Sequence, residues 1–196
     1  MIILASGSAT RQAMLRAAGV DFKAASAPVD EESIKQAMRL ETDDPAQVAQ
    51  TLAELKAVRV SAKHPGLMVI GADQMLECHG QWFDKPADRT AAAAQLVALR
   101  DKTHRLVSAV VVVRDGRRLW HHHQSARLTM RAFSDEFLRG YLDQAGTSVL
   151  SSVGAYQVEG LGAQLFKTIE GDHFTILGLP LLALLDFLRE NKEMHS

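Results

Sequence analysis

The chain has 196 residues, 47% of them hydrophobic, and its 22 Lys+Arg against 23 Asp+Glu leave a formal charge of -1. This length predicts a single domain over residues 1–196, with enough apolar residues to bury a core and to argue against disorder. The balanced charge excludes the basic excess of non-specific nucleic-acid binding proteins. The single cysteine, Cys78, excludes an internal disulfide and a Cys-rich zinc site.

The sequence also indicates where the chain resides. No apolar run approaches the ~18 residues of a membrane helix, and "MIILASGSATR" at the N-terminus lacks the charged region that opens a secretory signal. One unpaired cysteine fits a reducing compartment. We therefore expect a cytoplasmic chain with neither a membrane nor a nucleic acid as its partner.

Strand-like and helix-like segments alternate in the first half. The apolar run at residues 1–4 predicts a buried strand that leads through a Ser-Gly-Ser turn into a helix. Residues 21–32 predict a second short strand that runs into an acidic loop. Pro45 opens a long helix with one apolar face, and residues 67–72 form an apolar strand that ends by delivering Asp73.

The rest of the chain adds a hairpin-rich region and three more helices. In chain order, these features are a hairpin around Gly80, an alanine-rich helix capped by Asp88, two long strands joined by Asp115-Gly116, a helix from Ser134, a glycine-punctuated segment at 153–166 and a C-terminal helix started by Pro180. This mixture predicts an α/β fold with a mixed twisted sheet flanked by helices, in two lobes around a cleft.

The stretch "ASGSATR" is the first candidate for phosphate binding. A helix that begins after small residues presents backbone N–H groups and the positive end of its dipole, and Arg11 can add a bidentate cation. The alternative is structural: Ser8 caps the helix and Arg11 is a solvated helix residue. The glycine spacing excludes a P-loop.

Acidic residues supply the second candidate. Magnesium takes oxygen ligands and is held by one or two carboxylates plus substrate phosphates, so an acid among Asp30, Glu31 and Glu32 can share one ion with Asp73. Ligands collect at the carboxyl ends of strands in open α/β sheets, which favours Asp73. The alternatives are a solvated charge run for the loop and a turn residue for Asp73.

Other titratable residues are weaker candidates. Lys56 lies towards the end of the long helix, where a cation is favoured for structural reasons alone, and Lys85 precedes a proline in the loop after the hairpin. Three adjacent histidines, 121–123, point alternately to opposite faces of a strand and do not converge on a metal. Cys78 has no partner at a spacing that indicates a nucleophile and its base.

Eight ordered blocks carry a resemblance to a known family: "ILASGSATRQAML", "VDEE", "LAELKA", "VIGADQ", "DKP", "GAYQVEGLGA", "EGD" and "LGLPLLAL". In order and separation they resemble the Maf family of nucleoside triphosphate pyrophosphatases, from the first strand to about residue 188. The resemblance implies hydrolysis of a nucleoside triphosphate to the monophosphate and pyrophosphate with a divalent cation, Mg²⁺ or Mn²⁺. It also implies a fold similar to inosine triphosphate pyrophosphatases, and a homodimer.

The same resemblance implies residue roles. Asp73 looks like the proton acceptor, and Glu31 like the acid that supports the metal or the water, so both are expected metal ligands. The phosphate-contacting set that the resemblance implies is Ser8, Arg11, Lys56 and Lys85. These roles suit the reaction, because water must be oriented at the α-phosphorus while cations neutralise the phosphates.

Three residues bear on specificity by the same resemblance. Gln74 and Glu159 resemble the subgroup that hydrolyses 7-methyl-GTP, and a carboxylate can accept from the ring N–H and amine of guanine. Thr10 departs from that subgroup, which tends to carry Trp at this position. The alternatives are a dTTP and UTP pyrophosphatase of the same family, or a nucleotide-binding regulator of septum formation that does not turn over its ligand.

Overall fold

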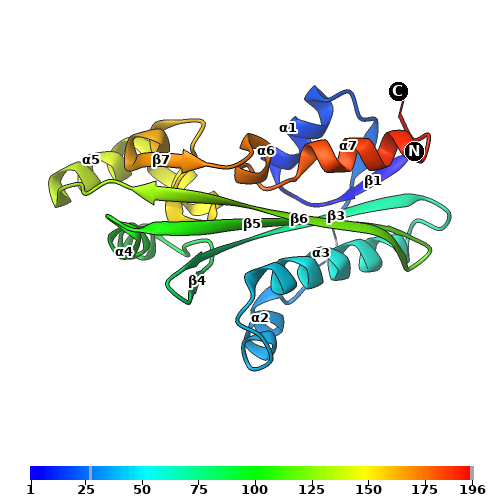
Figure 1. Ribbon diagram of the computed structural model, residues 1–196, viewed down its shortest axis with the longest axis horizontal. Coiled ribbons are helices and arrows are strands. Elements are labelled where there is room, and N and C mark those ends of the chain that lie inside the picture. Colours follow the sequence, from blue (N-terminus) through cyan, green and yellow to red (C-terminus); the bar gives the residue numbers. More distant parts are fainter. Residues whose placement is uncertain (27, 195–196) are drawn as a thin grey trace. The chain divides into compact units, whose positions relative to one another are not determined.

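The computed structural model describes residues 1–26 and 28–194, and within them the chain forms one seven-stranded sheet flanked by helices (Figure 1). The strands are β1 (Ile2–Ala5), β2 (Phe22–Ala24), β3 (Met68–Cys78), β4 (Gln81–Phe83), β5 (Thr103–Arg114), β6 (Arg117–Met130) and β7 (Phe166–Glu170). The α-helices are α1 (Ala9–Ala17), α2 (Glu31–Arg39), α3 (Pro45–Ser61), α4 (Arg89–Leu99), α5 (Asp135–Ala145), α6 (His173–Ile176) and α7 (Leu181–Glu190). Three short 3₁₀ helices are η1 (Gly146–Ser151), η2 (Val153–Ala155) and η3 (Leu161–Leu165).

The sheet is mixed, as predicted. Its strand order is β2-β1-β3-β5-β6-β7, and β4 pairs with β3 off this path. Strand β1 pairs in parallel with both β2 and β3, whereas the pairs β3–β4 and β6–β7 are antiparallel. The predicted α/β class with helices around a mixed sheet is therefore confirmed.

Contacts divide the chain into two compact units. The first comprises residues 1–74, 107–125 and 172–196, and the second comprises residues 75–106 and 126–171. The chain passes from one unit to the other within β3, β5 and β6. The expected cleft between two lobes stays a prediction.

Among the described residues, no helix is both long enough and apolar enough to cross a membrane.

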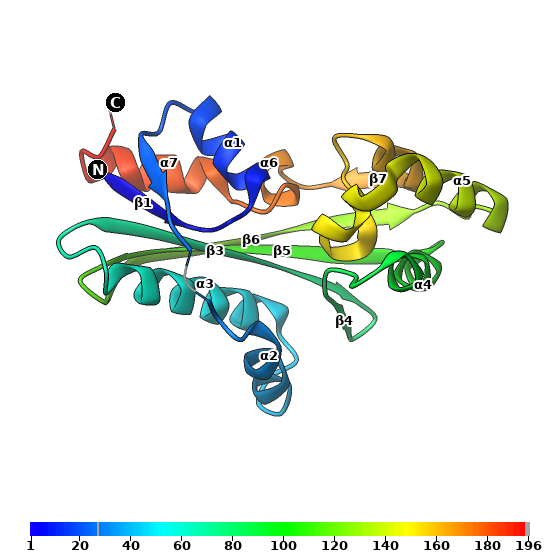
Figure 2. The same ribbon diagram turned by 180° about the vertical axis from the view of Figure 1, so that it is seen from behind.

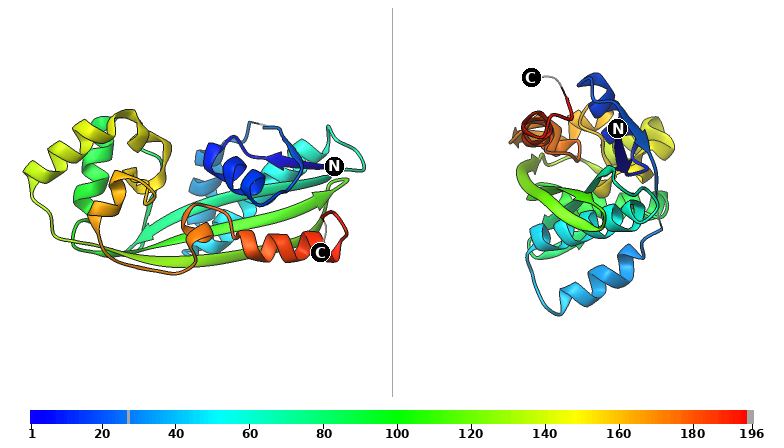
Figure 3. Two further views of the ribbon diagram at one scale, coloured as in Figure 1. Left: turned by 90° about the horizontal axis from the view of Figure 1, so that it is seen from above. Right: turned by 90° about the vertical axis from the view of Figure 1, so that its right-hand side faces the viewer.

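In the first unit, helices cover both faces of the sheet. Helices α1 and α7 lie on one face and α3 on the other, with α2 beyond α3 (Figures 1 and 2). All four residues of β1 are buried, as expected of a parallel strand covered on both sides. The N-terminus and the end of α7 lie at the same end of the first unit (Figure 3), and Glu193, just after α7, contacts the Met1 ammonium at 3.9 Å.

A glycine sets the distance between β3 and α3. A Cβ built on Gly71 would lie 2.0 Å from the Ala53 carbonyl oxygen and 2.9 Å from the Ala57 Cβ. The backbones of strand and helix therefore approach so closely that only hydrogen fits between them. This contact fixes the height of α3 above the strand.

Strand β3 is longer than its apolar start predicts. It continues through Asp73 to Cys78, because its second half pairs with β4 across a turn at His79 and Gly80. The hairpin around Gly80 is thus confirmed, but the prediction that the strand ends at Asp73 is wrong. The pairing with β1 does end close by, at Ala5 opposite Gly71, so Asp73 lies just beyond the carboxyl end of that neighbouring strand.

Two further elements differ from the prediction. The supposed acidic loop is the start of helix α2, with Asp30 as its N-cap accepting from the Ser33 N–H at 3.1 Å. The interpretation of this stretch as an acidic loop overlooks a helix signal, since an Asp cap followed by acidic first-turn residues is typical of a helix start. The glycine-punctuated segment forms 3₁₀ turns that end in strand β7. The cap predicted at Asp88 is confirmed, and the helix predicted from Ser134 begins with that residue as its N-cap.

A buried polar contact lies inside the second unit. His104 Nε2 is 2.7 Å from the Tyr156 hydroxyl, and the Tyr141 hydroxyl donates to the Ala155 carbonyl at 3.1 Å. Burial lowers the pKa of His104 to about 4, so the ring is neutral in the folded chain at pH 7. Burial also raises the pKa of Tyr156 well above its ordinary value. These groups therefore act as neutral hydrogen-bonding partners.

Replacing Gly71 by alanine should destabilise the first unit. The added Cβ meets helix backbone, which cannot move aside as a side-chain tip can, so we expect a loss of roughly 3 kcal/mol in the free energy of unfolding. Urea denaturation measures it. The control is Gly140→Ala in α5, where a Cβ meets nothing within 4 Å and should stabilise by roughly 0.5–1 kcal/mol. Equal effects at the two sites would contradict the close contact.

His104 should make stability depend on pH. Its folded pKa of about 4 lies below the ordinary 6.5, so the unfolded chain binds the proton first and stability falls as pH drops from 6.5 towards 4. Protonation of His104 should lower the free energy of unfolding by about 3 kcal/mol over this range. Urea denaturation at pH 7 and pH 4 should show a smaller decrease for His104→Gln than for the wild type. The exposed-site control His121→Gln should retain the wild-type decrease.

Candidate active site

The turn after β1 begins the candidate site. Ser8 caps helix α1, its hydroxyl accepting from the Arg11 N–H at 3.3 Å, and its own N–H points to the Ser6 hydroxyl at 3.3 Å. The predicted cap is confirmed. The turn directs the positive end of the α1 dipole outward from the carboxyl end of β1, which is an arrangement suited to an anion.

Arg11 is held by the protein rather than solvated. Its Nε donates to the Gly178 carbonyl at 2.7 Å, and its Nη1 donates to the Ala72 carbonyl at 3.1 Å and the Ser6 hydroxyl at 3.3 Å. The alternative of a solvated helix residue is therefore wrong. Desolvation lowers the pKa of the guanidinium, and the charges of Asp73 and Glu31 oppose that shift. Arginine remains charged at neutral pH.

Asp73 is a buried carboxylate with one oxygen unsatisfied. Its side chain is 7% exposed, and Oδ1 accepts from Lys56 Nζ at 2.5 Å. Oδ2 is buried and has no hydrogen-bond partner among residues 1–26 and 28–194. Buried polar atoms are nearly always paired, so an unpaired carboxylate oxygen points to a functional role. The alternative of a turn residue is excluded by its place within β3.

Lys56 joins Asp73 to a second carboxylate. Its Nζ lies 2.7 Å from Glu31 Oε1 as well as 2.5 Å from Asp73 Oδ1. The lysine side chain is 15% exposed and that of Glu31 is 43% exposed, so the cluster opens towards solvent on the side of Glu31. The structure thus brings together three predicted site residues, from α2, α3 and β3. A contact with phosphate stays a prediction for Lys56.

Gln74 points into a different network. Its Nε2 donates to the Ser108 hydroxyl at 3.0 Å and to the carbonyls of Thr175 and Ile176 at 3.2 and 3.0 Å. The Ser108 hydroxyl in turn donates to the Thr175 carbonyl at 2.7 Å. Sequence reasoning missed Ser108, Gly178 and the α6 carbonyls. No motif marks a backbone acceptor, but the family block "EGD" directly before α6 indicates that this part of the chain belongs near the site.

The remaining specificity and phosphate candidates are half-buried or exposed. Thr10 is half-buried on α1, whereas Lys85 lies between β4 and α4, and Glu159 lies in the loop before η3; both belong to the second unit. That loop is closed tightly, since a Cβ on Gly162 would lie 2.4 Å from the Gln157 carbonyl oxygen. The roles of Thr10, Lys85 and Glu159 stay predictions.

The Asp73 and Glu31 carboxylates fit a divalent cation. They offer hard oxygen donors, and Asp73 Oδ2 is available for a bond that the protein does not make. Within the described residues no three His, Cys, Asp or Glu side chains converge as a complete metal cage. Two carboxylates suffice for Mg²⁺ or Mn²⁺ where substrate phosphates and water complete the coordination.

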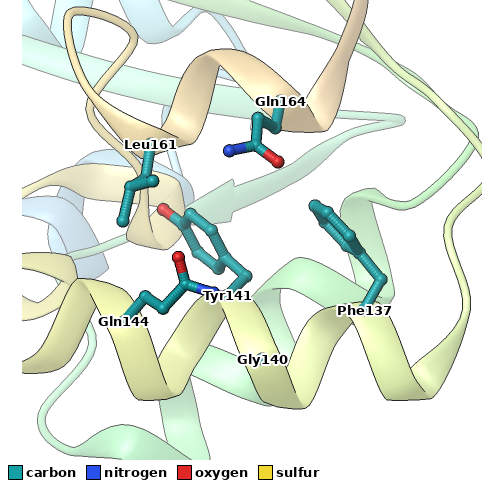
Figure 4. A pocket seen from close by; sticks show the side chains of 6 residues that line it. All are labelled: Phe137, Gly140, Tyr141, Gln144, Leu161 and Gln164. Carbon is teal, nitrogen blue, oxygen red and sulfur yellow. The ribbon is translucent and has the colours of Figure 1, made fainter.

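A separate cavity lies in the second unit. It measures about 210 Å³ and is lined by residues of α5 and η3: Phe137, Gly140, Tyr141, Gln144, Leu161 and Gln164 (Figure 4). These side chains are aromatic, aliphatic or amide, so the cavity has no cation for a phosphate. Burial raises the pKa of Tyr141 to about 12, which makes it a poor acid or base near neutral pH. None of the predicted site residues lines this cavity.

Comparison with known proteins identifies the family. The family model described as "Maf-like protein" matches residues 1–191. The chain belongs to the Maf family. The resemblance seen in the eight sequence blocks is thereby confirmed, and it extends past residue 188 into the end of α7.

Curated Maf relatives cover nearly the whole chain. One from Paramagnetospirillum magneticum, named nucleoside triphosphate pyrophosphatase, is 68% identical over 98% of this chain and 99% of its own length. One from Granulibacter bethesdensis has the same name at 50% identity, over 98% of each chain. A third, from Brucella abortus, is named 7-methyl-GTP pyrophosphatase and is 50% identical over 97% of this chain and 96% of its own.

A solved structure gives a weaker likeness. A nucleoside-triphosphatase / dITP/XTP pyrophosphatase from Mycobacterium abscessus matches with 20% identity and a TM-score of 0.44, over 97% of this chain and 96% of that one. A likeness of this strength carries no argument, so a fold similar to inosine triphosphate pyrophosphatases stays a prediction.

Proposed function

We propose that this chain is a nucleoside triphosphate pyrophosphatase, which hydrolyses a nucleoside triphosphate with water to the monophosphate and pyrophosphate. Membership of the Maf family and the names of relatives at 50–68% identity support this reaction. The observation that carries the proposal is the buried Asp73 carboxylate, with one oxygen held by Lys56 and the other unsatisfied.

Asp73 acts as the proton acceptor. Its Oδ1 accepts from the lysine ammonium before nucleotide binds, and Oδ2, which has no partner among the described residues, accepts the proton as water attacks the α-phosphorus. Water attack forms the bond from oxygen to the α-phosphorus and breaks the bond from that phosphorus to the bridging oxygen, which leaves with pyrophosphate. Holding the carboxylate in one orientation before substrate arrives lowers the cost of reaching the reactive geometry.

Cations and the helix terminus bind the phosphates. Arg11 has Nη2 still available after its bonds to Gly178, Ala72 and Ser6, and Ser8 lies at the positive end of α1. Lys85 contributes a further charge, a role that follows from the family resemblance. Asp73 and Glu31 would hold a Mg²⁺ or Mn²⁺ ion, which would neutralise charge on the phosphate oxygens.

The preferred substrate is a purine nucleotide of the 7-methyl-GTP type. Glu159 provides a carboxylate that can accept from the ring N–H and amine of guanine, groups that pyrimidine rings do not present in this pattern. Relatives equally similar at 50% identity carry either the general name or the 7-methyl-GTP name, so overall similarity does not decide between them. The pyrimidine alternative, dTTP and UTP, is therefore part of the test.

Asp73→Asn should abolish turnover. The amide keeps the shape of the side chain but cannot take the proton, so we expect kcat to fall by about 10² to 10⁴-fold with little change in nucleotide affinity. The assay offers 7-methyl-GTP, GTP, dTTP and UTP with Mg²⁺ or Mn²⁺ and measures monophosphate and pyrophosphate. Chelation of the metal should stop release of both products.

The matched control is Asp143→Asn, which removes an exposed acid in the second unit that pairs with Arg89. It should keep the wild-type rate. Release of orthophosphate alone, or tight nucleotide binding without any hydrolysis, would disprove the proposed reaction, and the second result would favour a nucleotide-binding regulator.

Glu159→Gln should change substrate choice without affecting chemistry. The amide presents a donor where the carboxylate accepts, so kcat/KM for 7-methyl-GTP should fall by roughly 10 to 100-fold relative to dTTP. Glu170→Gln, another exposed acid of the second unit, serves as the control. A higher kcat/KM for dTTP or UTP than for 7-methyl-GTP in the unmodified chain would reverse the assignment of substrate.

A further inference from the structure

We propose that the Lys56 ammonium occupies the place of the divalent cation until nucleotide arrives, so that the chain takes up its metal together with the nucleotide and binds the free ion only weakly. This inference rests on the proposed function, because it assigns Glu31 and Asp73 to the metal. It adds a way in which metal uptake is controlled. Lys56 pairs first with the two carboxylates and then, once nucleotide is bound, with the triphosphate.

The geometry of the cluster carries the inference. One nitrogen contacts both carboxylates, at 2.7 Å from Glu31 Oε1 and 2.5 Å from Asp73 Oδ1. The two carboxylates therefore lie close enough to be bridged by a single cation, and the bridging cation in this structure is the ammonium. Glu31 projects from helix α2 and Asp73 from strand β3. The two carboxylates therefore meet because of the fold and not because of one local turn.

Asp73 Oδ2 is the second observation. The side chain is more than nine-tenths buried, and this oxygen has no partner within the described part of the chain. The ammonium on Oδ1 leaves the other oxygen unpaired, whereas a divalent cation in its place brings bound water that can donate to Oδ2. With Lys56 the two carboxylates thus keep one uncompensated negative charge, and one oxygen of Asp73 remains unpaired.

Electrostatics explains why the two cations exclude one another. An ammonium and a divalent ion on the same pair of carboxylates repel strongly at this distance in a partly buried site. The triphosphate brings several negative charges and its own oxygen ligands, which offset the repulsion and give Lys56 a new partner. The flexible four-carbon stem of lysine allows that change of partner without movement of helix α3.

The test measures Mn²⁺ binding without nucleotide and without turnover, by electron paramagnetic resonance of the free ion. The wild type should bind Mn²⁺ weakly, and Lys56→Gln should bind it at least about tenfold more tightly, because the shorter amide side chain carries no charge. Lys56→Arg keeps the charge and should bind as weakly as the wild type. The control Lys63→Gln removes an exposed lysine beyond α3 and should also match the wild type.

A second variant checks where the ion binds. The double variant Lys56→Gln/Asp73→Asn should lose the gain in affinity, and Mn²⁺ should raise the melting temperature of Lys56→Gln but not of the double variant. Mn²⁺ affinity of Lys56→Gln within twofold of the wild type would overturn the inference, as would equal gains for the glutamine and arginine variants.

The wild-type chain provides a test that does not depend on a variant folding. A non-hydrolysable triphosphate analogue should tighten Mn²⁺ binding by at least about tenfold, and Mn²⁺ should tighten analogue binding by the same factor. Equally tight Mn²⁺ binding with and without the analogue would overturn the inference. Since no measurement requires turnover, the pyrophosphatase proposal can fail or succeed independently.

Discussion

The close approach of β3 to α3 at Gly71 is the constraint on which the candidate site depends. Without a side chain at this position, the strand lies directly against the Ala53 carbonyl and the Ala57 Cβ. Side chains alternate along a strand, so Asp73, two residues further on, faces the same helix. Lys56 precedes Ala57 on that helix and reaches Asp73 at 2.5 Å. The absence of one methyl group thus determines whether the ammonium and the carboxylate can meet.

Burying the Asp73 carboxylate in this position carries an electrostatic cost. A buried charge is tolerated when it is paired, and a single partner seldom compensates fully for the water that is lost. Lys56 pairs with one oxygen only, and it is shared with Glu31, so the carboxylate remains incompletely satisfied. Such a site gains more from an added cation or a proton than a fully paired one does. The incomplete pairing of the Asp73 carboxylate thus costs stability and at the same time leaves an oxygen able to accept a proton.

Much of the fold followed from local signals. The caps at Ser8 and Asp88, the helix start at Ser134 and the Asp115-Gly116 turn each depend on a few neighbouring residues, and all of them are confirmed. The extent of β3 did not follow, because an acid inside an apolar run suggests an end, while pairing with β4 carries the strand onward. Helix α2 was missed because its acidic first turn was interpreted as solvated loop.

The site residues were predicted from family resemblance, but their geometry was not. Lys56 and Asp73 are 17 positions apart, and Arg11 and Gly178 are 167 apart, so neither contact leaves a periodic signal. Lys56 was expected on phosphate or at a helix terminus, and its bridge between two carboxylates follows only from the packing of α3. The acceptors of Arg11 are mostly backbone carbonyls, which any residue can supply and no motif marks.

Alternation along β3 also separates the two polar neighbours in "GADQ". Asp73 faces α3, whereas Gln74 faces the opposite side with Ile70 and Ala72, whose side chains belong to the core under α1 and α7. The Gln74 amide nitrogen is engaged by Ser108 and by two carbonyls of α6, so any contact with a nucleobase falls to its Oε1. Gln74 Oε1 lies beside Gly178: a Cβ built on that glycine would be 3.7 Å from Oε1 and 3.4 Å from the Arg11 guanidinium. Gln74 therefore holds the carbonyls of α6 beside Gly178 and Arg11.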